Sequence, residues 1–116
     1  ETDYNPPDWI FAPVWTTLYL MMTTAIWIFW HSKGRNMNTV YIYFIHVAFN
    51  TTWSVVFFGF HQIFLALVVL IILILLIMTL IIKFKRVNFV SYYLMIPYLL
   101  WCCYALFLNL NILLLN

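Results

Sequence analysis

Aromatic and polar side chains recur at helical spacing in three uncharged segments of this chain. At steps of four, three and four residues, one helix face of the middle segment would carry His46, Asn50, Trp53 and Phe57. Similar stripes are Trp15, Leu18, Tyr19 and Met22 in the first segment, and Pro97, Trp101, Tyr104 and Leu108, with Ala105 and Asn109 beside them, in the last. Indole and phenol rings with a few hydrogen-bonding groups are the usual lining of a pocket for a flat apolar ligand.

The polar groups also have a structural interpretation, and it stays open. A buried amide in hydrocarbon costs several kcal/mol unless it is hydrogen-bonded. Asn50 and Asn109 would then bond one another or backbone carbonyls and hold helices together, which periodicity alone favours over ligand contact. His46 fits an interhelical hydrogen bond better than a haem or metal ligand, so we predict no metal site.

Other rings lie near the expected ends of the uncharged segments, where membrane proteins concentrate Trp and Tyr. We expect an interfacial belt made of Trp9, Trp27, Trp30, Tyr41 and Tyr43.

These segments must be membrane-spanning helices. Of the residues, 67% are hydrophobic and 7% charged, which excludes a soluble fold. A bilayer core about 30 Å thick needs about 20 apolar residues of helix. Gly59 divides the longest uncharged stretch, and Pro97 is expected to kink or locally break the last span. The sequence predicts one all-α domain over 1–116 with four transmembrane helices, at about 13–30, 40–58, 63–82 and 89–115.

Charge gives the orientation. All 5 Lys and Arg residues fall in the linkers 31–39 and 83–88, and all 3 acids lie before the first span. If the protein lies in a bacterial plasma membrane, the positive-inside rule puts the basic linkers on its cytoplasmic side. A eukaryotic protein would lie in the mitochondrial outer membrane. Cys102 and Cys103 are adjacent within the last span, where a disulfide between neighbours would be strained, so both are expected to be inert thiols that behave as small hydrophobes. No nucleotide loop, carboxylate pair or nucleophile triad is present, so hydrolysis, phosphoryl transfer and a nucleic-acid partner are not expected.

Three blocks of sequence, in order along the chain, resemble one family. Residues 6–19 read PPDWIFAPVWTTLY, residues 50–59 read NTTWSVVFFG, and residues 97–109 read PYLLWCCYALFLN. They resemble the PPxWxFxPVWTxLY, NxxWSxxFFG and PYxxWxxFAxxLN signatures of the TspO/MBR family, which comprises the tryptophan-rich sensory proteins and the mitochondrial translocator protein.

The resemblance implies a fold of five transmembrane helices, of which this chain holds the second to the fifth. Either the sequence is truncated or this member works with four helices. Residues 1–12 would be the remaining part of the loop that covers the pocket mouth. The resemblance also implies a homodimeric receptor or transporter for porphyrins and related tetrapyrroles. Sterol binding is not expected, because Leu110 and Leu114 replace the Tyr and Arg of the sterol motif.

Carried over by position, the ligand-binding residues would be Trp15, Tyr19, His46, Asn50, Trp53, Trp101 and Ala105. His46 departs from the Gln or Asn usual in the family, which would make binding pH-sensitive if the imidazole titrates. Our hypothesis is that a porphyrin or haem binds as ligand, with no cofactor required, between Trp15 and Trp101 as stacking walls.

Three other roles are open. Light-dependent porphyrin breakdown is attributed to some family members, and we rank it below simple binding. A non-catalytic membrane scaffold or regulator is the main alternative. A small multidrug exporter would have this length but would need an acidic residue inside the membrane, and the chain has none after Asp8.

Overall fold

The computed structural model describes residues 8–115, without the side chains of 8–12 and 58. It contains four long helices: α1 (Asp8–Trp30), α2 (Met37–Ser54), α3 (Ile63–Lys85) and α4 (Phe89–Leu115). A short π-helical turn, η1 (Val55–Gly59), continues α2. The predicted all-α fold with four helices is confirmed, and the breaks fall at the charged clusters and just after Gly59.

The first helix differs at its start. α1 begins at Asp8, before the expected boundary near residue 13, and Pro13 therefore lies within the helix rather than at its beginning. The loop expected over residues 1–12 therefore includes helical residues from Asp8 onward, and its remaining part, residues 1–7, lies outside the described residues. α4 likewise continues through Pro97 as one helix to Leu115.

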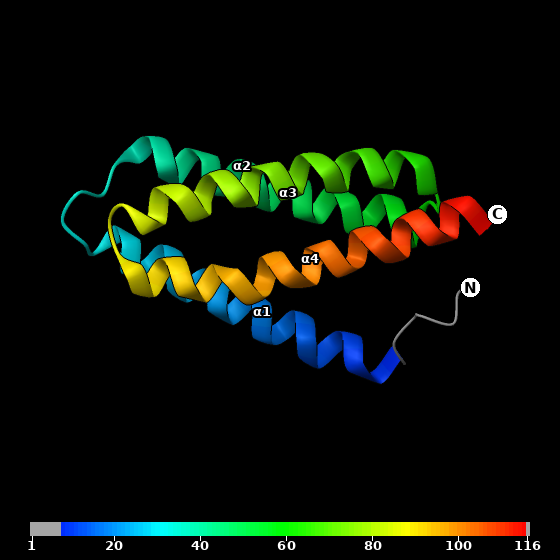
Figure 1. Ribbon diagram of the computed structural model, residues 1–116, viewed down its shortest axis with the longest axis horizontal. Coiled ribbons are helices and arrows are strands. Elements are labelled where there is room, and N and C mark those ends of the chain that lie inside the picture. The colour runs from blue at the N-terminus through cyan, green and yellow to red at the C-terminus, as the bar shows by residue number, and fades with distance from the viewer. Residues whose placement is uncertain (1–7, 116) are drawn as a thin grey trace.

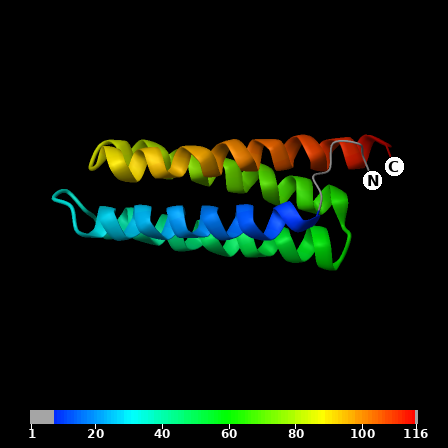
Figure 2. The ribbon, with the colours of Figure 1, turned by 90° about the horizontal axis from the view of Figure 1, so that it is seen from below.

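The helices form a bundle in which α1 and α2 make one layer and α3 and α4 the other (Figures 1 and 2). Backbones pack closely between α3 and α4, between α2 and α3, and between α1 and α4. α1 and α2 are consecutive in the chain, yet their backbones meet at few points. Side-chain contacts, such as those of Tyr19 with Asn50 and of Trp15 with Trp53, therefore join these two helices along a seam.

Three of the described helical segments are long and apolar enough to cross a membrane: Met37–Phe57, Ile63–Lys85 and Phe89–Leu115. α1 has 23 residues, as many as α3, but its Trp, Tyr, Thr and Pro residues lower its hydropathy. α3 is the most apolar of these segments and exposes one flank of aliphatic side chains, such as Ile71 and Leu75. That flank suits contact with lipid tails.

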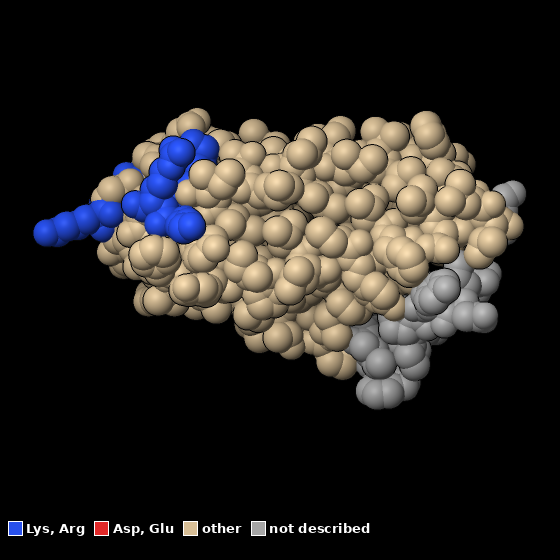
Figure 3. Space-filling view, in the orientation of Figure 1, with Lys and Arg blue, Asp and Glu red and all other residues tan. Residues whose placement is uncertain are grey.

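Both basic linkers lie at the same end of the bundle. Asn88 donates from Nδ2 to the Ser32 hydroxyl at 3.1 Å, which joins one linker to the other. All Lys and Arg residues gather at this end (Figure 3). The clustering of Lys and Arg that predicted the orientation is therefore present in the folded chain.

Small and polar groups hold the helices at close approach. Ala25 and Ala66 are fully buried, and the Ser91 hydroxyl donates to the Ala25 carbonyl at 2.8 Å, joining α4 to α1. α2 is capped by Asn36, whose Oδ1 accepts from the Thr39 amide at 2.8 Å. Short side chains and interhelical hydrogen bonds are the usual means of helix association in a membrane.

Replacing each of the two glycines by alanine should change stability by unequal amounts. Gly34 has φ +90, which L side chains rarely adopt, and an added Cβ would lie 3.8 Å from Val87. Gly34→Ala should destabilise the fold by about 1 kcal/mol. Gly59 has an ordinary φ and its Cβ would meet only Val55 at 3.9 Å, so Gly59→Ala should be neutral or slightly stabilising. Unfolding midpoints in detergent test this pair, and equal midpoints for the two variants would contradict it.

Candidate ligand-binding site

Trp15 on α1 lies at the centre of a group of rings drawn from three helices. Its ring centroid is 5.8 Å from that of Tyr19, 6.3 Å from that of Trp53 on α2 and 6.4 Å from that of Trp101 on α4. We call these four residues the aromatic cluster. Separations of this size are those of rings in direct contact. The cluster thus spans the seam between α1 and α2, where the backbones pack least.

The two expected stacking walls do not face each other. The planes of Trp15 and Trp101 meet at 88°, an edge-to-face contact. A flat ligand that stacks on either indole must therefore use a face that the other indole leaves uncovered, since these two rings are not parallel walls in this conformation. Both indoles are only partly buried, whereas Trp53 is 4% exposed.

A chain of hydrogen bonds leads from the cluster into the core. The Tyr19 hydroxyl donates to Asn50 Oδ1 at 2.8 Å, and Asn50 Nδ2 donates to the Tyr98 hydroxyl oxygen at 2.6 Å. The Tyr98 hydroxyl lies 2.8 Å from His46 Nε2, and His46 Nδ1 lies 2.9 Å from the Tyr43 carbonyl oxygen. We call these groups, from Tyr19 to the Tyr43 carbonyl, the hydrogen-bond chain.

The partners fix the direction of each bond. A carbonyl oxygen only accepts, so the proton of the imidazole sits on His46 Nδ1, which donates to Tyr43. Asn50 Nδ2 already donates to the Tyr98 oxygen, so in the neutral form of the imidazole the Tyr98 hydroxyl donates its proton to Nε2. In this neutral form every link from Tyr19 to Tyr43 points the same way.

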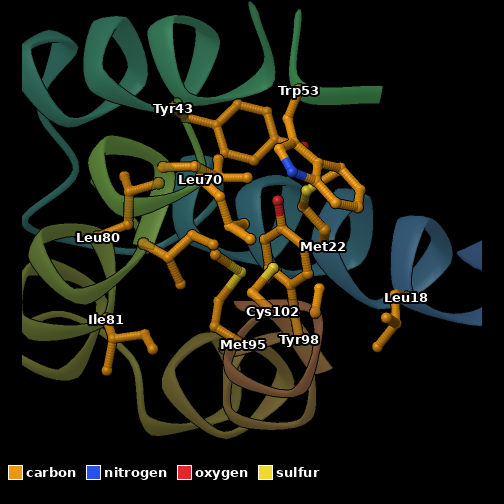
Figure 4. Close-up of a cluster of buried hydrophobic side chains, with 14 of the residues drawn as sticks. Leu18, Met22, Tyr43, Trp53, Leu70, Leu80, Ile81, Met95, Tyr98 and Cys102 are labelled. Atoms are coloured by element: carbon orange, nitrogen blue, oxygen red, sulfur yellow. The ribbon is translucent and has the colours of Figure 1, made fainter. Parts of the chain in front are cut away.

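Burial is graded along the hydrogen-bond chain. Tyr19 is 40% exposed, Asn50 is 1% exposed, and both Tyr98 and His46 are fully buried. Figure 4 shows the Tyr98 hydroxyl rising from α4 toward the side of the core where Tyr43 and Trp53 lie. One end of the hydrogen-bond chain therefore meets the surroundings of the bundle, and the other end lies inside it.

Asn109 supports the cluster from α4. Its Oδ1 accepts from Trp53 Nε1 at 3.2 Å, and its Nδ2 donates to the Ile63 carbonyl at 3.1 Å. The expectation that Asn50 and Asn109 bond one another is wrong. The Asn50 amide donates to the Tyr98 hydroxyl oxygen, and the Asn109 amide accepts from the Trp53 indole. The expectation that an amide bonds a backbone carbonyl holds for Asn109.

Ring contacts and hydrogen bonds connect the sequence-predicted residues apart from Ala105, and His46 is connected only through Tyr98. Ala105, the last of them, is 8% exposed and lies on the buried face of α4, at helical spacing from Cys102 and Asn109. His46 is buried behind Tyr98 rather than in the aromatic cluster. The predicted set thus divides into a ring group at the seam and a polar group in the core.

Sequence reasoning missed Tyr98, the residue at the centre of the polar group. The predicted inward stripe of the last helix consists of Pro97, Trp101, Tyr104 and Leu108, with Ala105 and Asn109 beside it. The buried face includes the last three of these residues, and its other members are Ser91, Met95, Tyr98 and Cys102. The available signal was the spacing of the small or polar members: Cys102, Ala105 and Asn109 follow one another at steps of three and four, and Tyr98 lies four residues before Cys102.

The prediction of an interfacial aromatic belt agrees with the structure for some residues and not for others. Trp27, Trp30 and Tyr41 are exposed as expected, while the Trp9 side chain lies outside the described residues. Tyr43 is 5% exposed, so its assignment to the belt is wrong. Its position three residues before His46 puts it on the inward face of α2.

A separate apolar groove of about 350 Å³ lies between α1 and α2, close to the first basic linker. It is lined by Thr23, Ile26, Trp27, Trp30, Met37, Val40 and Phe44. The sequence-predicted ligand residues are not among them. Within residues 8–115, no three His, Cys, Asp or Glu side chains gather as a group that could hold a metal ion.

Comparison with known proteins identifies the family. The model of the TspO/MBR family matches residues 1–115. This chain belongs to the TspO/MBR family. It is 38% identical over 120 residues to the tryptophan-rich protein TspO of Chlorobaculum tepidum, covering 100% of this chain and 75% of that protein. The tryptophan-rich sensory protein of Cereibacter sphaeroides is 33% identical, with 97% of this chain and 71% of that protein covered.

A human relative matches as well. The translocator protein of Homo sapiens is 29% identical over 113 residues, covering 94% of this chain and 67% of that protein. Family membership and the long apolar helices together make this TspO/MBR chain an integral membrane protein. The predicted family and the predicted membrane localisation are confirmed.

Proposed function

We propose that this TspO/MBR protein is a membrane receptor that binds a planar tetrapyrrole, such as a porphyrin, at the aromatic cluster. The observation that carries the proposal is the convergence of Trp15, Trp53 and Trp101 from three helices on one seam of the bundle. Large rings with a polar group beside them are the usual lining of sites for flat apolar ligands.

The geometry favours one mode of entry. The cluster lies where α1 and α2 are joined by side chains, through contacts such as Tyr19 to Asn50, rather than by packed backbones. Side chains change rotamer more readily than packed helices separate. A ligand would therefore enter through the seam and stack on a face of Trp15 or Trp101 that the other indole leaves uncovered. The Tyr19 hydroxyl would be its first polar partner.

Replacing Trp101 by Ala tests the site. Loss of one stacking ring at the centre of a small apolar site should cost about 2 kcal/mol of binding free energy, or roughly thirtyfold in affinity. The measurement is a dark titration of the detergent-purified chain with protoporphyrin IX, followed by the shift of the porphyrin absorption band. Trp27→Ala is the matched control, because Trp27 is 63% exposed and lies outside the cluster.

Equal loss in both variants, or unchanged affinity for Trp101→Ala, would remove the cluster as the site. No saturable binding to the wild-type chain would favour the scaffold alternative. Drug efflux that depends on a proton gradient would favour an exporter, although the chain offers no carboxylate side chain after Asp8 to exchange protons.

A further inference from the structure

His46, Tyr98, Asn50 and Tyr19 form a continuous path between a buried imidazole and a hydroxyl at the seam. We propose that this path couples the binding of a carboxylate-bearing ligand at Tyr19 to the uptake of one proton by His46. The inference rests on the proposed function, since it names the charge of the ligand that the same site prefers and the group that balances that charge.

Protonation of His46 would change the direction of bonds in the hydrogen-bond chain. In the neutral state His46 Nε2 accepts from Tyr98. A proton added to Nε2 turns this nitrogen into a donor, so the Tyr98 hydroxyl proton must leave that bond and find another acceptor. The neighbour within reach is Asn50, 2.6 Å from the Tyr98 oxygen.

Asn50 can provide that acceptor by turning its amide through half a turn, because Oδ1 and Nδ2 have nearly the same shape. The amide nitrogen then faces Tyr19 and donates to its oxygen. The Tyr19 hydroxyl, which had donated to Asn50, is left to donate outward. Adding a proton at the buried end thus reverses the three bonds between His46 Nε2 and Tyr19, leaves the bond from His46 Nδ1 to the Tyr43 carbonyl unchanged, and presents a donor at the seam.

A ligand carboxylate is the natural acceptor for that donor. An anion alone at the edge of a hydrocarbon-like site is costly, and an imidazolium alone in the core is costly as well. When the carboxylate and the imidazolium are present together, their opposite charges stabilise each other. The hydroxyls and the amide between them are polarised in the same direction, which strengthens the hydrogen bonds. The equilibrium consumes one proton from solvent for each carboxylate ligand bound, and only the N–H bond at Nε2 is formed.

Other ionisable groups near His46 do not offer a competing site. On its own helix the neighbouring titratable group is Tyr43, and α4 contributes Tyr98 and the thiol of Cys102. α1 contributes Tyr19, and α3 has no titratable side chain before Lys83. None of the groups named around His46 carries a charge near neutral pH in its ordinary form. His46 is therefore the group that takes up the proton.

The test measures affinity against pH with two probes. Protoporphyrin IX carries two carboxylates, and its dimethyl ester carries none. Between about pH 6 and 8, binding of the acid to the wild-type chain should tighten as pH falls, by up to about tenfold per pH unit relative to His46→Gln. The ester should show the same weak pH dependence in the wild-type chain and in His46→Gln.

Three variants make the result specific. Tyr98→Phe and Tyr19→Phe each break the path while His46 is retained, and both should lose the extra pH dependence. Tyr19→Phe guards against misfolding, because Tyr19 is partly exposed. His61→Asn is the matched control: His61 is exposed and has φ 55, which Asn tolerates, so this variant should keep the wild-type pH dependence.

The outcomes separate the two proposals. If porphyrin binds saturably but His46→Gln and the wild-type chain show the same pH dependence, the proton coupling is wrong and the receptor function stands. If neither probe binds saturably, the proposed function fails and the coupling fails with it.

Discussion

Replacing Tyr98 by Phe should lower the free energy of unfolding by about 2 kcal/mol, although the change removes a single oxygen atom. That oxygen accepts from Asn50 at 2.6 Å and bonds His46 Nε2 at 2.8 Å in a fully buried setting. The substitution would leave a buried donor on Asn50 and a buried acceptor on His46 without this partner. A buried polar group without a partner costs about 1 to 3 kcal/mol, and the lower part of that range applies inside membranes.

The measurement is the unfolding midpoint in detergent, and Tyr93→Phe is the control. Tyr93 lies on the same helix and is 65% exposed, so loss of its hydroxyl should change stability by less than about 0.5 kcal/mol. A double variant Tyr98→Phe, His46→Leu should recover part of the loss, because the orphaned imidazole goes with its partner. Equal effects of Tyr98→Phe and Tyr93→Phe would show that the buried hydroxyl bridges nothing.

Replacing Asn109 by Leu should have the second large effect, on stability and on ligand binding together. The fully buried amide holds Trp53 Nε1 at 3.2 Å and the Ile63 carbonyl at 3.1 Å, so it ties α4 to α2 and to the start of α3. Leu is of comparable size and makes neither bond. We expect a loss of about 1 to 2 kcal/mol in stability.

Binding should weaken as well, because the Trp53 ring packs against Trp15 and loses the bond that orients it. Asn111→Leu is the matched control, since Asn111 bonds the Phe107 carbonyl on its own helix, near the surface. Unfolding midpoints and protoporphyrin titrations of both variants check the prediction. Wild-type behaviour of Asn109→Leu would mean that Trp53 is positioned by packing alone.

The sequence predicts the elements well because their limits are chemical. Charged clusters and Gly59 stop the spans, and Asn36 and Asn88 cap α2 and α4. The apolar composition that identifies a span does not show which face of the helix points inward. When nearly every residue is apolar, hydropathy does not distinguish the face toward a neighbouring helix from the face toward lipid.

Polar and small residues are the better guide to orientation. On α2 the imidazole and the amide marked the inward face correctly, since His46 and Asn50 are buried. On α4 the predicted inward face includes Trp101 and Tyr104, which are only partly buried. Large rings are a weaker guide to the inward face, because they suit a lipid interface as well as a core. Spacing on α4 can place Tyr98 on the buried face, but its hydrogen-bond partners come from α2 and are not visible in any pattern on α4.

The most direct test of the account is to locate a bound porphyrin among the tryptophans by fluorine NMR. The chain has 6 Trp residues, and 5-fluorotryptophan gives each one a resonance that single substitutions can assign. Adding protoporphyrin IX in the dark should shift the resonances of Trp15, Trp53 and Trp101 through the ring current of the ligand. Those of Trp27 and Trp30, which line the groove between α1 and α2, should stay in place. Shifts confined to Trp27 and Trp30 would move the ligand to that groove and contradict the assignment of the aromatic cluster as the binding site.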